Sequence, residues 1–146
     1  MKAAVLTSVV ALVFAVNVNA KNVKTYSNVT NEESGVKKEY TTFKNDNSQP
    51  LSKVSYQYDN DGCIQEKVVS KWNNEKGWVD SEKYSYKYNE SGQVETLAYT
   101  KWDTKKNTWS NKSDVLLYGY NTNNEFSSID QIEVKKEAEY KYISQK

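Results

Sequence analysis

The sequence predicts an all-β protein, an antiparallel meander of about seven to nine strands built from hairpin repeats of about 30 residues and forming an open twisted sheet or a partial barrel. Three observations predict this class. Beyond residue 20 the chain keeps only two alanines, Ala98 and Ala138, while Tyr, Thr, Val, Ser and Asn abound. Apolar and polar residues alternate with a period of two. A unit rich in Tyr and Trp recurs along the chain.

The first twenty residues are typical of a secretory leader. Lys2 precedes an apolar run over residues 3–16, and Val18-Asn19-Ala20 places small residues at the expected cleavage positions. We therefore expect cleavage after Ala20 and export to the periplasm, the cell surface or the extracellular space. The leader is too short to span a membrane stably, and no membrane span is expected. Residues 21–146 would form a single all-β domain.

The strands are expected in a simple order along this domain. A weak strand near Val23–Val29 precedes Val36–Phe43 and Val54–Tyr58, which the polar loop 45–50 connects. The strands of the repeated unit follow, and Phe126–Val134 is a further strand. Lys135–Tyr142 is ambiguous.

The repeated unit consists of Tyr-x-Tyr, a turn, a strand, Lys-Trp, a second turn and a second Trp. Residues 56–64 read Tyr-Gln-Tyr-Asp-Asn-Asp-Gly-Cys-Ile and reappear thirty residues later, at 86–94, as Tyr-Lys-Tyr-Asn-Glu-Ser-Gly-Gln-Val. Residues 118–126 open a worn third copy. A Gly four residues after the second Tyr fits a type I turn followed by a left-handed residue, which is the three-residue hairpin loop with a G1 bulge, and Asn124 suits the same position.

The loop length predicts the register. Tyr58 is expected to pair with Ile64, and Tyr88 with Val94. Regular pairing from there places four residues of each hairpin on one face: Tyr56, Val54, Glu66 and Val68 in the first, and Tyr86, Tyr84, Thr96 and Ala98 in the second.

The Trp residues are expected to pair across the second kind of turn. Trp72 would pair with Trp78 and Trp102 with Trp109, so that the four form a band at one end of the sheet, on the face of the Tyr residues. The spacing from the second Trp to the next Tyr-x-Tyr is eight residues in one copy and nine in the other. We therefore expect a β-bulge between Ser110 and Leu117 that restores the common face.

Two resemblances rest on these residues. The Tyr-x-Tyr-Asp-x-x-Gly stretch at residues 56–62 resembles the YD repeats of large secreted bacterial shell and wall-associated proteins, which implies hairpin architecture alone. The overall layout, with a leader ending Asn-Ala-Lys, the Tyr-x-Tyr turn, Lys-Trp-Asn and a second Trp, is similar to a family of small secreted Bacteroidales proteins of unknown function. This resemblance spans nearly the whole chain. It implies an exported protein of gut bacteria and transfers no catalytic residue.

The composition excludes several kinds of chemistry. The chain has no His and no Arg, and Cys63 is its one cysteine. It therefore lacks a Ser/His/Asp or Cys/His nucleophile, an imidazole metal ligand, a guanidinium group and a multi-cysteine zinc site. Loss of Lys2 from the 20 basic residues leaves 19, which balance 19 acidic residues and argue against a nucleic-acid partner. No cofactor, metal or catalytic residue is predicted.

The strongest candidate binding site is the Trp band with one neighbouring carboxylate. Flat aromatic surfaces rimmed by polar groups suit sugar rings, whose C–H faces stack on aromatics while their hydroxyls bind polar side chains. The residues of this candidate site are Trp72, Trp78, Trp102, Trp109 and Asp80. The alternative is structural, because cross-strand Trp pairs next to turns also hold the register and close a core that is poor in aliphatic residues.

Three other features invite a function. Glu66 and Glu82 would be diagonal neighbours in the expected register, near the separation of about 5–5.5 Å in a retaining glycosidase, although cross-strand ion pairs also explain such residues. The stretch 59–62, Asp-Asn-Asp-Gly, resembles a calcium loop but lacks its first and last ligands, and turn formation is enough to explain it. Cys63 either links two copies or is incidental.

The expected function is that of an exported β-sheet protein that binds or scaffolds and does not catalyse, with a glycan or a cell-surface protein as its partner. One alternative is a small glycan-active hydrolase using Glu66 and Glu82. The other is a structural module that adds strands edge to edge to a partner.

Overall fold

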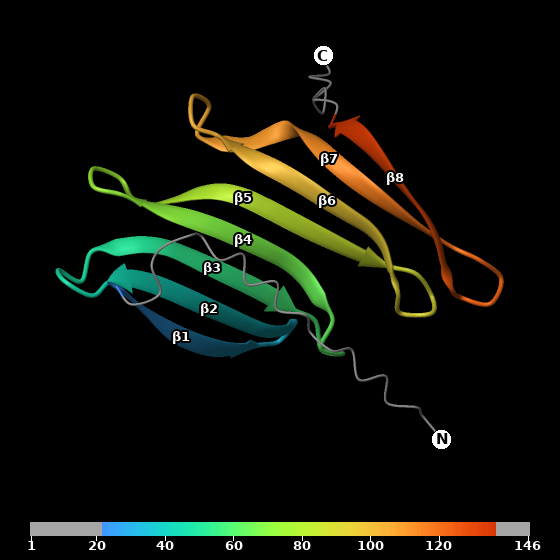
Figure 1. Cartoon of the computed structure of the whole chain (residues 1–146), viewed down its shortest axis with the longest axis horizontal. Coiled ribbons are helices and arrows are strands. Elements are labelled where there is room, and N and C mark those ends of the chain that lie inside the picture. The colour runs from blue at the N-terminus through green and yellow to red at the C-terminus, as the bar shows by residue number, and fades with distance from the viewer. Residues whose placement is uncertain (1–21, 137–146) are drawn as a thin grey trace, which may run out of the picture.

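The computed structural model describes residues 22–136, which contain one open antiparallel sheet of eight strands (Figure 1). The strands are β1 Val23–Glu32, β2 Gly35–Lys44, β3 Pro50–Tyr58, β4 Ile64–Asn73, β5 Gly77–Tyr88, β6 Val94–Asp103, β7 Thr108–Tyr120 and β8 Phe126–Lys135. They lie in chain order, so β1 and β8 are free edges and the sheet is not closed into a barrel. The predicted all-β meander is confirmed. The leader and most of the stretch 135–142 lie outside the described residues.

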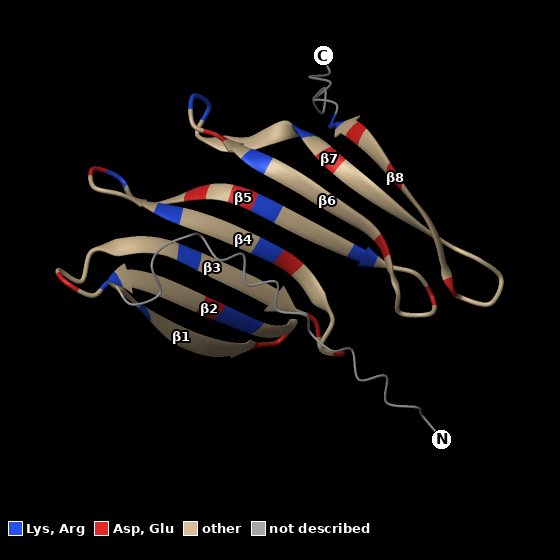
Figure 2. Cartoon of the chain, in the orientation of Figure 1, with Lys and Arg blue, Asp and Glu red and all other residues tan. Residues whose placement is uncertain are grey.

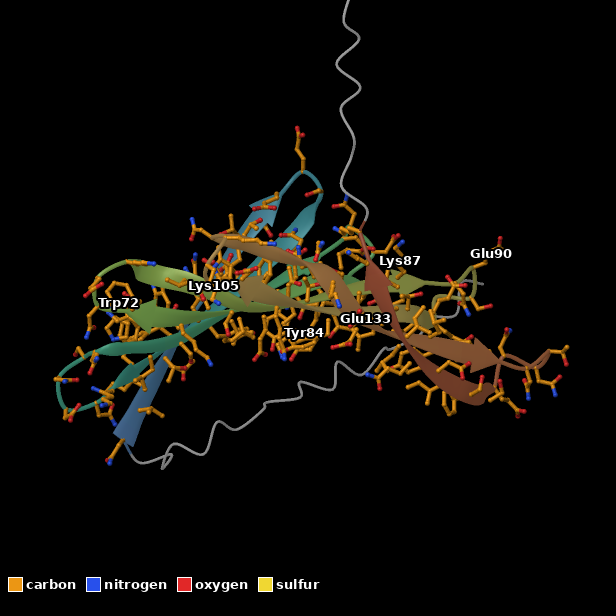
Figure 3. All side chains as sticks on the ribbon, turned by 90° about the horizontal axis from the view of Figure 1, so that it is seen from above. Trp72, Tyr84, Lys87, Glu90, Lys105 and Glu133 are labelled. Carbon is orange, nitrogen blue, oxygen red and sulfur yellow. The ribbon has the colours of Figure 1, made fainter. Side chains whose placement is uncertain are left out.

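The described part of the chain is a single layer with side chains on both faces (Figure 3). Val115, 6% exposed, is the only buried apolar side chain in residues 22–136, and no side chain in that range is fully buried. The other apolar and aromatic side chains are half-buried or exposed. Cross-strand side-chain contacts therefore provide the stabilisation that a second layer provides in most domains.

The three Tyr-x-Tyr loops share one geometry. The first loop residue accepts two main-chain N–H groups with one side-chain oxygen: Asp59 Oδ1 accepts from Asp61 at 3.0 Å and from Cys63 at 2.8 Å. Asn89 and Asn121 repeat this pattern in the other copies. As expected, each loop contains a left-handed residue: Gly62 (φ 80°), Gly92 (φ 77°) and Asn124 (φ 61°). The Asp and Gly of this loop are therefore explained by turn chemistry.

A β-bulge follows each of these loops. Tyr58 pairs with Ile64 as expected, but the next pair is Gln57 with Glu66, which leaves Gln65 as an extra residue. The second and third hairpins show the same shift at the same place. A shift of one residue moves every later side chain of the strand to the other face.

The predicted faces are therefore wrong beyond each bulge. Glu66 and Val68 do not share the face of Tyr56, and Thr96 and Ala98 do not share the face of Tyr86. One face, called the tyrosine face below, carries Tyr40, Tyr56, Tyr58, Tyr84, Tyr86, Tyr88, Tyr99, Tyr118 and Tyr120. The other, the tryptophan face, carries Trp72, Trp78, Trp102 and Trp109 with Glu66, Ser70, Asp80 and Thr100.

Two further irregularities lie next to the Trp pairs. In β5, Ser81 is an extra residue without a partner in β4. In β7, the stretch between Trp109 and Ser113 is two residues longer than the β6 stretch opposite it, so an irregularity is present where a bulge was expected. It does not bring Tyr118 to the face of Trp109, and that part of the prediction is wrong. In both copies the Tyr and Trp residues lie on opposite faces.

The second Tyr of each later copy bonds to the bulge of the copy before it. The Tyr88 hydroxyl donates to the carbonyl oxygen of Ile64 at 2.7 Å, and the Tyr120 hydroxyl donates to that of Val94 at 2.6 Å. Ile64 and Val94 are the first residues of their strands, beside the bulges. These hydrogen bonds join neighbouring hairpins and give the second Tyr of the repeat a structural role.

Charges of both signs are interspersed over the strands (Figure 2). The ion pairs recorded in residues 22–136 are Lys37 with Glu39 at 3.2 Å and Lys112 with Glu133 at 2.9 Å. Both are substantially exposed, so each contributes little to stability.

Candidate functional site

The four Trp lie at one end of the sheet, beside two hairpin turns. Trp72 at the end of β4 faces Trp78 at the start of β5, with ring centroids 5.2 Å apart and planes at 76°. Trp102 and Trp109 have the same relation between β6 and β7, at 5.1 Å and 87°. Both pairs have the edge-to-face geometry that aromatic rings favour. The predicted pairing and the common face of the four Trp are confirmed.

Side-chain caps hold the two turns. The Asn73 Oδ1 atom accepts the main-chain N–H groups of Glu75 and Lys76, both at 2.9 Å. Asp103 does the same in its turn, at 3.0 and 3.1 Å. Each cap lies directly next to a Trp, so the turn fixes the backbone from which that Trp projects.

A hollow opens between the two Trp hairpins because β5 and β6 stop pairing before the turns. Their ladder ends at Glu82 and Lys101, and residues 77–81 of β5 have no partner in β6. The β4–β5 and β6–β7 turns diverge beyond that point (Figure 1). The hollow has a volume of about 380 Å³. Its lining consists of two aromatic side chains, two lysines, one valine and five other polar side chains: Trp72, Trp102, Lys71, Lys76, Val79, Asn73, Asp80, Ser81, Thr104 and Asn107.

Of the four Trp, Trp72 of β4 and Trp102 of β6 line this hollow. Lys53 Nζ lies 5.0 Å from the centre of the Trp78 ring, and Lys83 Nζ lies 4.7 Å from that of Trp109. These cation–π contacts engage the rings of Trp78 and Trp109, which do not line the hollow. Trp72, seen at one end of the sheet in Figure 3, and Trp102 of the other hairpin both line the hollow.

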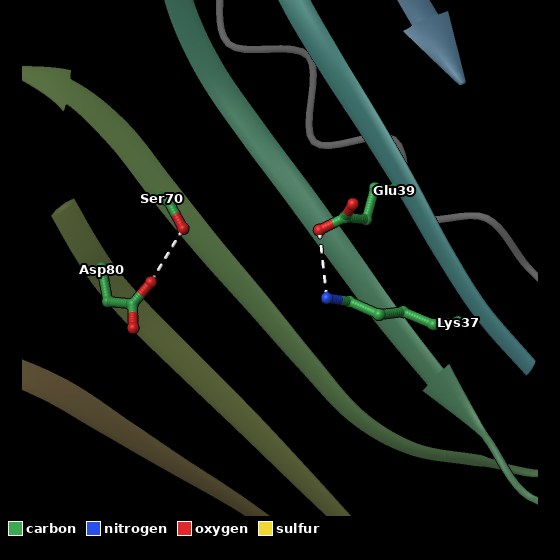
Figure 4. Close-up of polar contacts among 4 residues, drawn as sticks. All are labelled: Lys37, Glu39, Ser70 and Asp80. Carbon is green, nitrogen blue, oxygen red and sulfur yellow. Dashed lines mark hydrogen bonds and ion pairs between the residues drawn. The ribbon is translucent and has the colours of Figure 1, made fainter. Parts of the chain in front are cut away.

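Two polar groups lie at these rings, of which one has a hydrogen-bond partner and the other has none. Asp80 Oδ1 accepts a hydrogen bond from the buried Ser70 hydroxyl at 2.9 Å, which orients the carboxylate (Figure 4). Trp102 Nε1 is buried and has no hydrogen-bond partner within residues 22–136. A buried donor without an acceptor costs about 1–3 kcal/mol, so an acceptor that reached it would be bound favourably.

Sequence reasoning identified three of the residues around the hollow and missed others. Trp72, Trp102 and Asp80 were predicted, whereas Ser81, Thr104 and Asn107 were not. Asn107 has a φ of 52° in the β6–β7 turn, and Ser81 is the bulge residue of β5. Their residue types signal a turn or a bulge, so the sequence offers no sign that they adjoin a hollow.

The predicted carboxylate pair does not form, because Glu66 and Glu82 lie on opposite faces. Glu66 lines a second hollow of about 400 Å³ on the tryptophan face. Lys37 and Glu39, which form the ion pair drawn in Figure 4, line the same hollow. Glu82 accepts a hydrogen bond from the Tyr84 hydroxyl at 3.1 Å on the tyrosine face. A retaining glycosidase needs both carboxyl groups about 5–5.5 Å apart beside one substrate. The hydrolase hypothesis is therefore wrong for these two residues.

The tyrosine face holds one buried lysine. Lys67 is 8% exposed, and its Nζ lies 4.9 Å from the centre of the Tyr84 ring and 6.0 Å from that of Tyr56. Burial lowers the pKa of Lys67, and nearby Glu82 opposes this effect. Burial, assisted by the hydrogen bond to Glu82, raises the pKa of Tyr84 to about 12. The Tyr84 hydroxyl therefore stays protonated, as a donor, at neutral pH.

The remaining chemistry-bearing groups are few. Within residues 22–136, no three Asp, Glu or Cys side chains are grouped so that they could hold a metal ion. Over the same range, no helix has the length and apolar character needed to cross a membrane. Cys63 is half-buried, and burial followed by the charges of Asp59 and Asp61 raises the pKa of its thiol. A raised pKa lowers the fraction of reactive thiolate.

The fold and the hollow define a class of protein, a single open sheet of Tyr/Trp hairpins with an aromatic hollow at one end. The chain belongs to DUF3836, a family of unknown function whose model matches residues 1–118. The predicted resemblance to a Bacteroidales family of unknown function is thereby confirmed.

Three solved structures are similar to this chain. A DUF3836 family protein from Parabacteroides distasonis is 19% identical, with a TM-score of 0.44 over 77% of this chain and 91% of that one. A DUF3836 family protein from Bacteroides vulgatus is 18% identical, with a TM-score of 0.45 over 76% and 98%. A protein of unknown function from Bacteroides fragilis is 19% identical, with a TM-score of 0.42 over 77% and 92%. No curated protein matches the sequence.

Proposed function

We propose that this chain is an exported carbohydrate-binding protein without catalytic activity, and that the hollow between the two Trp hairpins takes the sugar. The observation that carries the proposal is the presence of two indole rings, Trp72 and Trp102, among small hydrogen-bonding side chains around one hollow. The C–H face of a sugar ring stacks on an aromatic ring, while its hydroxyls need donors and acceptors within reach. Export is supported by the leader over residues 1–20.

The polar side chains of the hollow match what a sugar presents. The Asp80 carboxylate accepts hydrogen bonds from hydroxyls and has oxygen lone pairs beyond the one that Ser70 uses. The Asn107 amide both donates and accepts, and the Ser81 and Thr104 hydroxyls do either.

The charge of the chain favours a sugar over other partners that stack on aromatic rings. The formal net charge is +1 at pH 7, and the loss of Lys2 with the leader makes it zero. Proteins that bind single-stranded nucleic acids combine stacking with a strongly positive groove. This chain has the stacking groups without such a groove, because acidic residues are interspersed with its lysines (Figure 2).

Tryptophan fluorescence tests the proposal, read as emission maximum and iodide quenching across a panel of soluble glycans. We expect one glycan class to shift the emission and to protect it from iodide. Trp72→Ala and Trp102→Ala should each weaken that binding at least about tenfold, which corresponds to ~1.4 kcal/mol. Trp78→Phe and Trp109→Phe are matched controls, because they keep a ring under the neighbouring lysine and do not line the hollow.

Urea unfolding separates lost binding from lost folding. Trp72→Phe and Trp102→Phe, which keep an aromatic ring, serve where an Ala variant does not fold. If no glycan changes the emission, or if folded variants of Trp72 and Trp102 bind the glycan as the parent does, the proposal fails.

A further inference from the structure

We infer that β8 pairs with β8 of a second copy of this chain, edge to edge and antiparallel, to form a two-fold symmetric dimer with one continuous sheet. All ten residues of β8 are exposed. Four of them are large apolar side chains that are between 41% and 59% exposed: Phe126, Ile129, Ile132 and Val134. β1, the other edge, has only two such side chains, Tyr26 and Val29.

β8 has only part of the usual protection of an edge strand. Natural edges are kept from pairing by prolines, bulges, charged side chains, short strands or covering loops. β8 carries three charged residues, Asp130, Glu133 and Lys135, and a bulge at Ser127 near its start. β8 contains no proline, and its register with β7 is regular from Ser128 to Lys135. Its main chain is therefore regular enough over this stretch to pair with a further strand.

The main-chain groups of β8 that point to the free edge can be assigned from its pairing with β7. The N–H group of Lys136 donates to the Asn111 carbonyl oxygen at 2.7 Å, so Lys136 points to β7. Alternate residues of an antiparallel strand point the same way, and the register is regular along this stretch. The residues in between point their N–H and C=O groups away from β7: Ile129, Gln131, Glu133 and Lys135.

A two-fold axis at Ile132 uses all of these groups. Gln131 then pairs with Glu133 of the second copy, and Ile129 pairs with Lys135 of the second copy, with hydrogen bonds exchanged at each pair. Ile132 lies opposite Ile132 of the second copy at a position without ladder hydrogen bonds, where side chains approach most closely. Two apolar side chains that are 42% exposed in the single chain would thus cover each other.

The same register brings one pair of opposite charges together, because Asp130 becomes the diagonal neighbour of Lys136 of the second copy. Glu133 lies opposite Gln131 of the second copy, and the two Glu133 side chains are diagonal to each other across the axis. An axis at Glu133 would instead place two carboxylates directly opposite each other. An axis at Gln131 would place Ile132 opposite Asp130. The apolar contact of the two Ile132 side chains and the Asp130–Lys136 pair therefore favour the axis at Ile132.

Light scattering during size-exclusion chromatography of residues 21–146, over a concentration series, tests this dimer. We expect the mass to rise with concentration to twice that of one chain and no further, because each β8 edge is already paired in the dimer and cannot bind a third chain. Gln131→Pro removes an N–H group that points away from β7 and should give a single chain at concentrations where the parent is a dimer.

Ser27→Pro is the matched control on the other edge. Asn45 N–H donates to the Asn22 carbonyl oxygen at 2.9 Å, so by the same alternation the Ser27 N–H group points away from β2. This variant should remain a dimer. If the parent is a single chain throughout, or if Gln131→Pro does not change its mass, the proposal is overturned. The parent could also form assemblies of more than two chains, and both Pro variants could abolish them. That result would show head-to-tail pairing of β8 with β1 and would overturn the proposed dimer.

Disulfide trapping tests the register. In a Cys63→Ser background, Ile132→Cys should yield a disulfide-linked dimer on mild oxidation, because the two Cys would face each other across the axis. Ile129→Cys is the control and should not cross-link, since it would face Lys135 of the second copy. The reverse result would overturn the assigned axis. None of these measurements involves the Trp hollow, so this proposal and the carbohydrate proposal fail independently.

Discussion

The hydrogen bond from Tyr88 to the preceding bulge provides a direct test of how neighbouring hairpins are joined. Tyr88→Phe removes a hydroxyl that donates to the Ile64 carbonyl oxygen at 2.7 Å in a half-buried position, and it leaves the ring in place. The lost hydrogen bond and the partly desolvated carbonyl should together cost about 1–2 kcal/mol of the free energy of unfolding. Burial raises the pKa of Tyr88 to about 12, so the parent hydroxyl is a donor throughout the neutral range.

The repeat supplies the control for this substitution. Tyr58 occupies the same position in the first copy, with no earlier copy to contact, and its ring lies 4.9 Å from Lys38 Nζ, a contact that Phe retains. Tyr58→Phe should therefore change stability by less than about 0.5 kcal/mol. Tyr120→Phe, which loses a hydrogen bond of 2.6 Å to Val94, should behave like Tyr88→Phe. Urea unfolding followed by circular dichroism measures all three. Equal losses for Tyr58→Phe and Tyr88→Phe would refute the role given to the bulge carbonyl.

Three further predictions concern backbone conformation and pH. Gly35→Ala should lower the free energy of unfolding by more than about 2 kcal/mol, because a Cβ at Gly35 meets the Tyr58 carbonyl group. Gly62→Ala should lower it by only about 1 kcal/mol, because the space around Gly62 is empty and only its positive φ opposes a side chain there. Comparable losses in urea unfolding would contradict this. Asn124→Gly should be neutral or slightly stabilising, because Asn124 has a φ of 61°, and Asn124→Ala should lose about 1 kcal/mol; thermal unfolding of both variants decides. Tyr84 and Tyr88 have folded-state pKa values of about 12 against 10.0 for a free Tyr, so their contribution to stability is complete below pH 10 and is lost as the pH rises toward 12. Tyrosinate absorbance and unfolding should change together in that window, and full ionisation of tyrosine near pH 10 in the folded protein would contradict it.

The repeat made the hairpins predictable from the sequence, but it did not make the faces predictable. The loop spacing identified the pairs Tyr58 with Ile64 and Tyr88 with Val94, and the Lys-Trp spacing identified both Trp pairs. The bulge that follows each loop has no composition signal, since its extra residue is an ordinary polar one such as Gln65. Because side chains alternate with a period of two, this single residue reverses the face of everything after it.

The hollow could not be predicted because it depends on where two strands stop pairing. The sequence identified Trp72, Trp102 and Asp80 as site residues, yet each was assigned from local spacing. The divergence of β5 from β6 beyond Glu82 results from the combined twist and irregularities of several strands. Such an effect involves residues that are far apart in the chain, and no short pattern encodes it.

The strict chain order of the strands makes the hairpin the unit by which this architecture can grow or shrink. Within residues 22–136 every strand pairs only with its neighbours in the chain, so the sheet behaves as a one-dimensional array in which the interactions run mainly between adjacent hairpins. Removing residues 59–88 would connect Tyr58 to Asn89 and leave β3 antiparallel to β6, joined by a loop of the same geometry. Gene duplication could lengthen such a sheet, and deletion could shorten it, without any new core having to be designed at the junction. A lineage could in this way vary the number of aromatic ends that it displays while the packing rules of every hairpin stay the same.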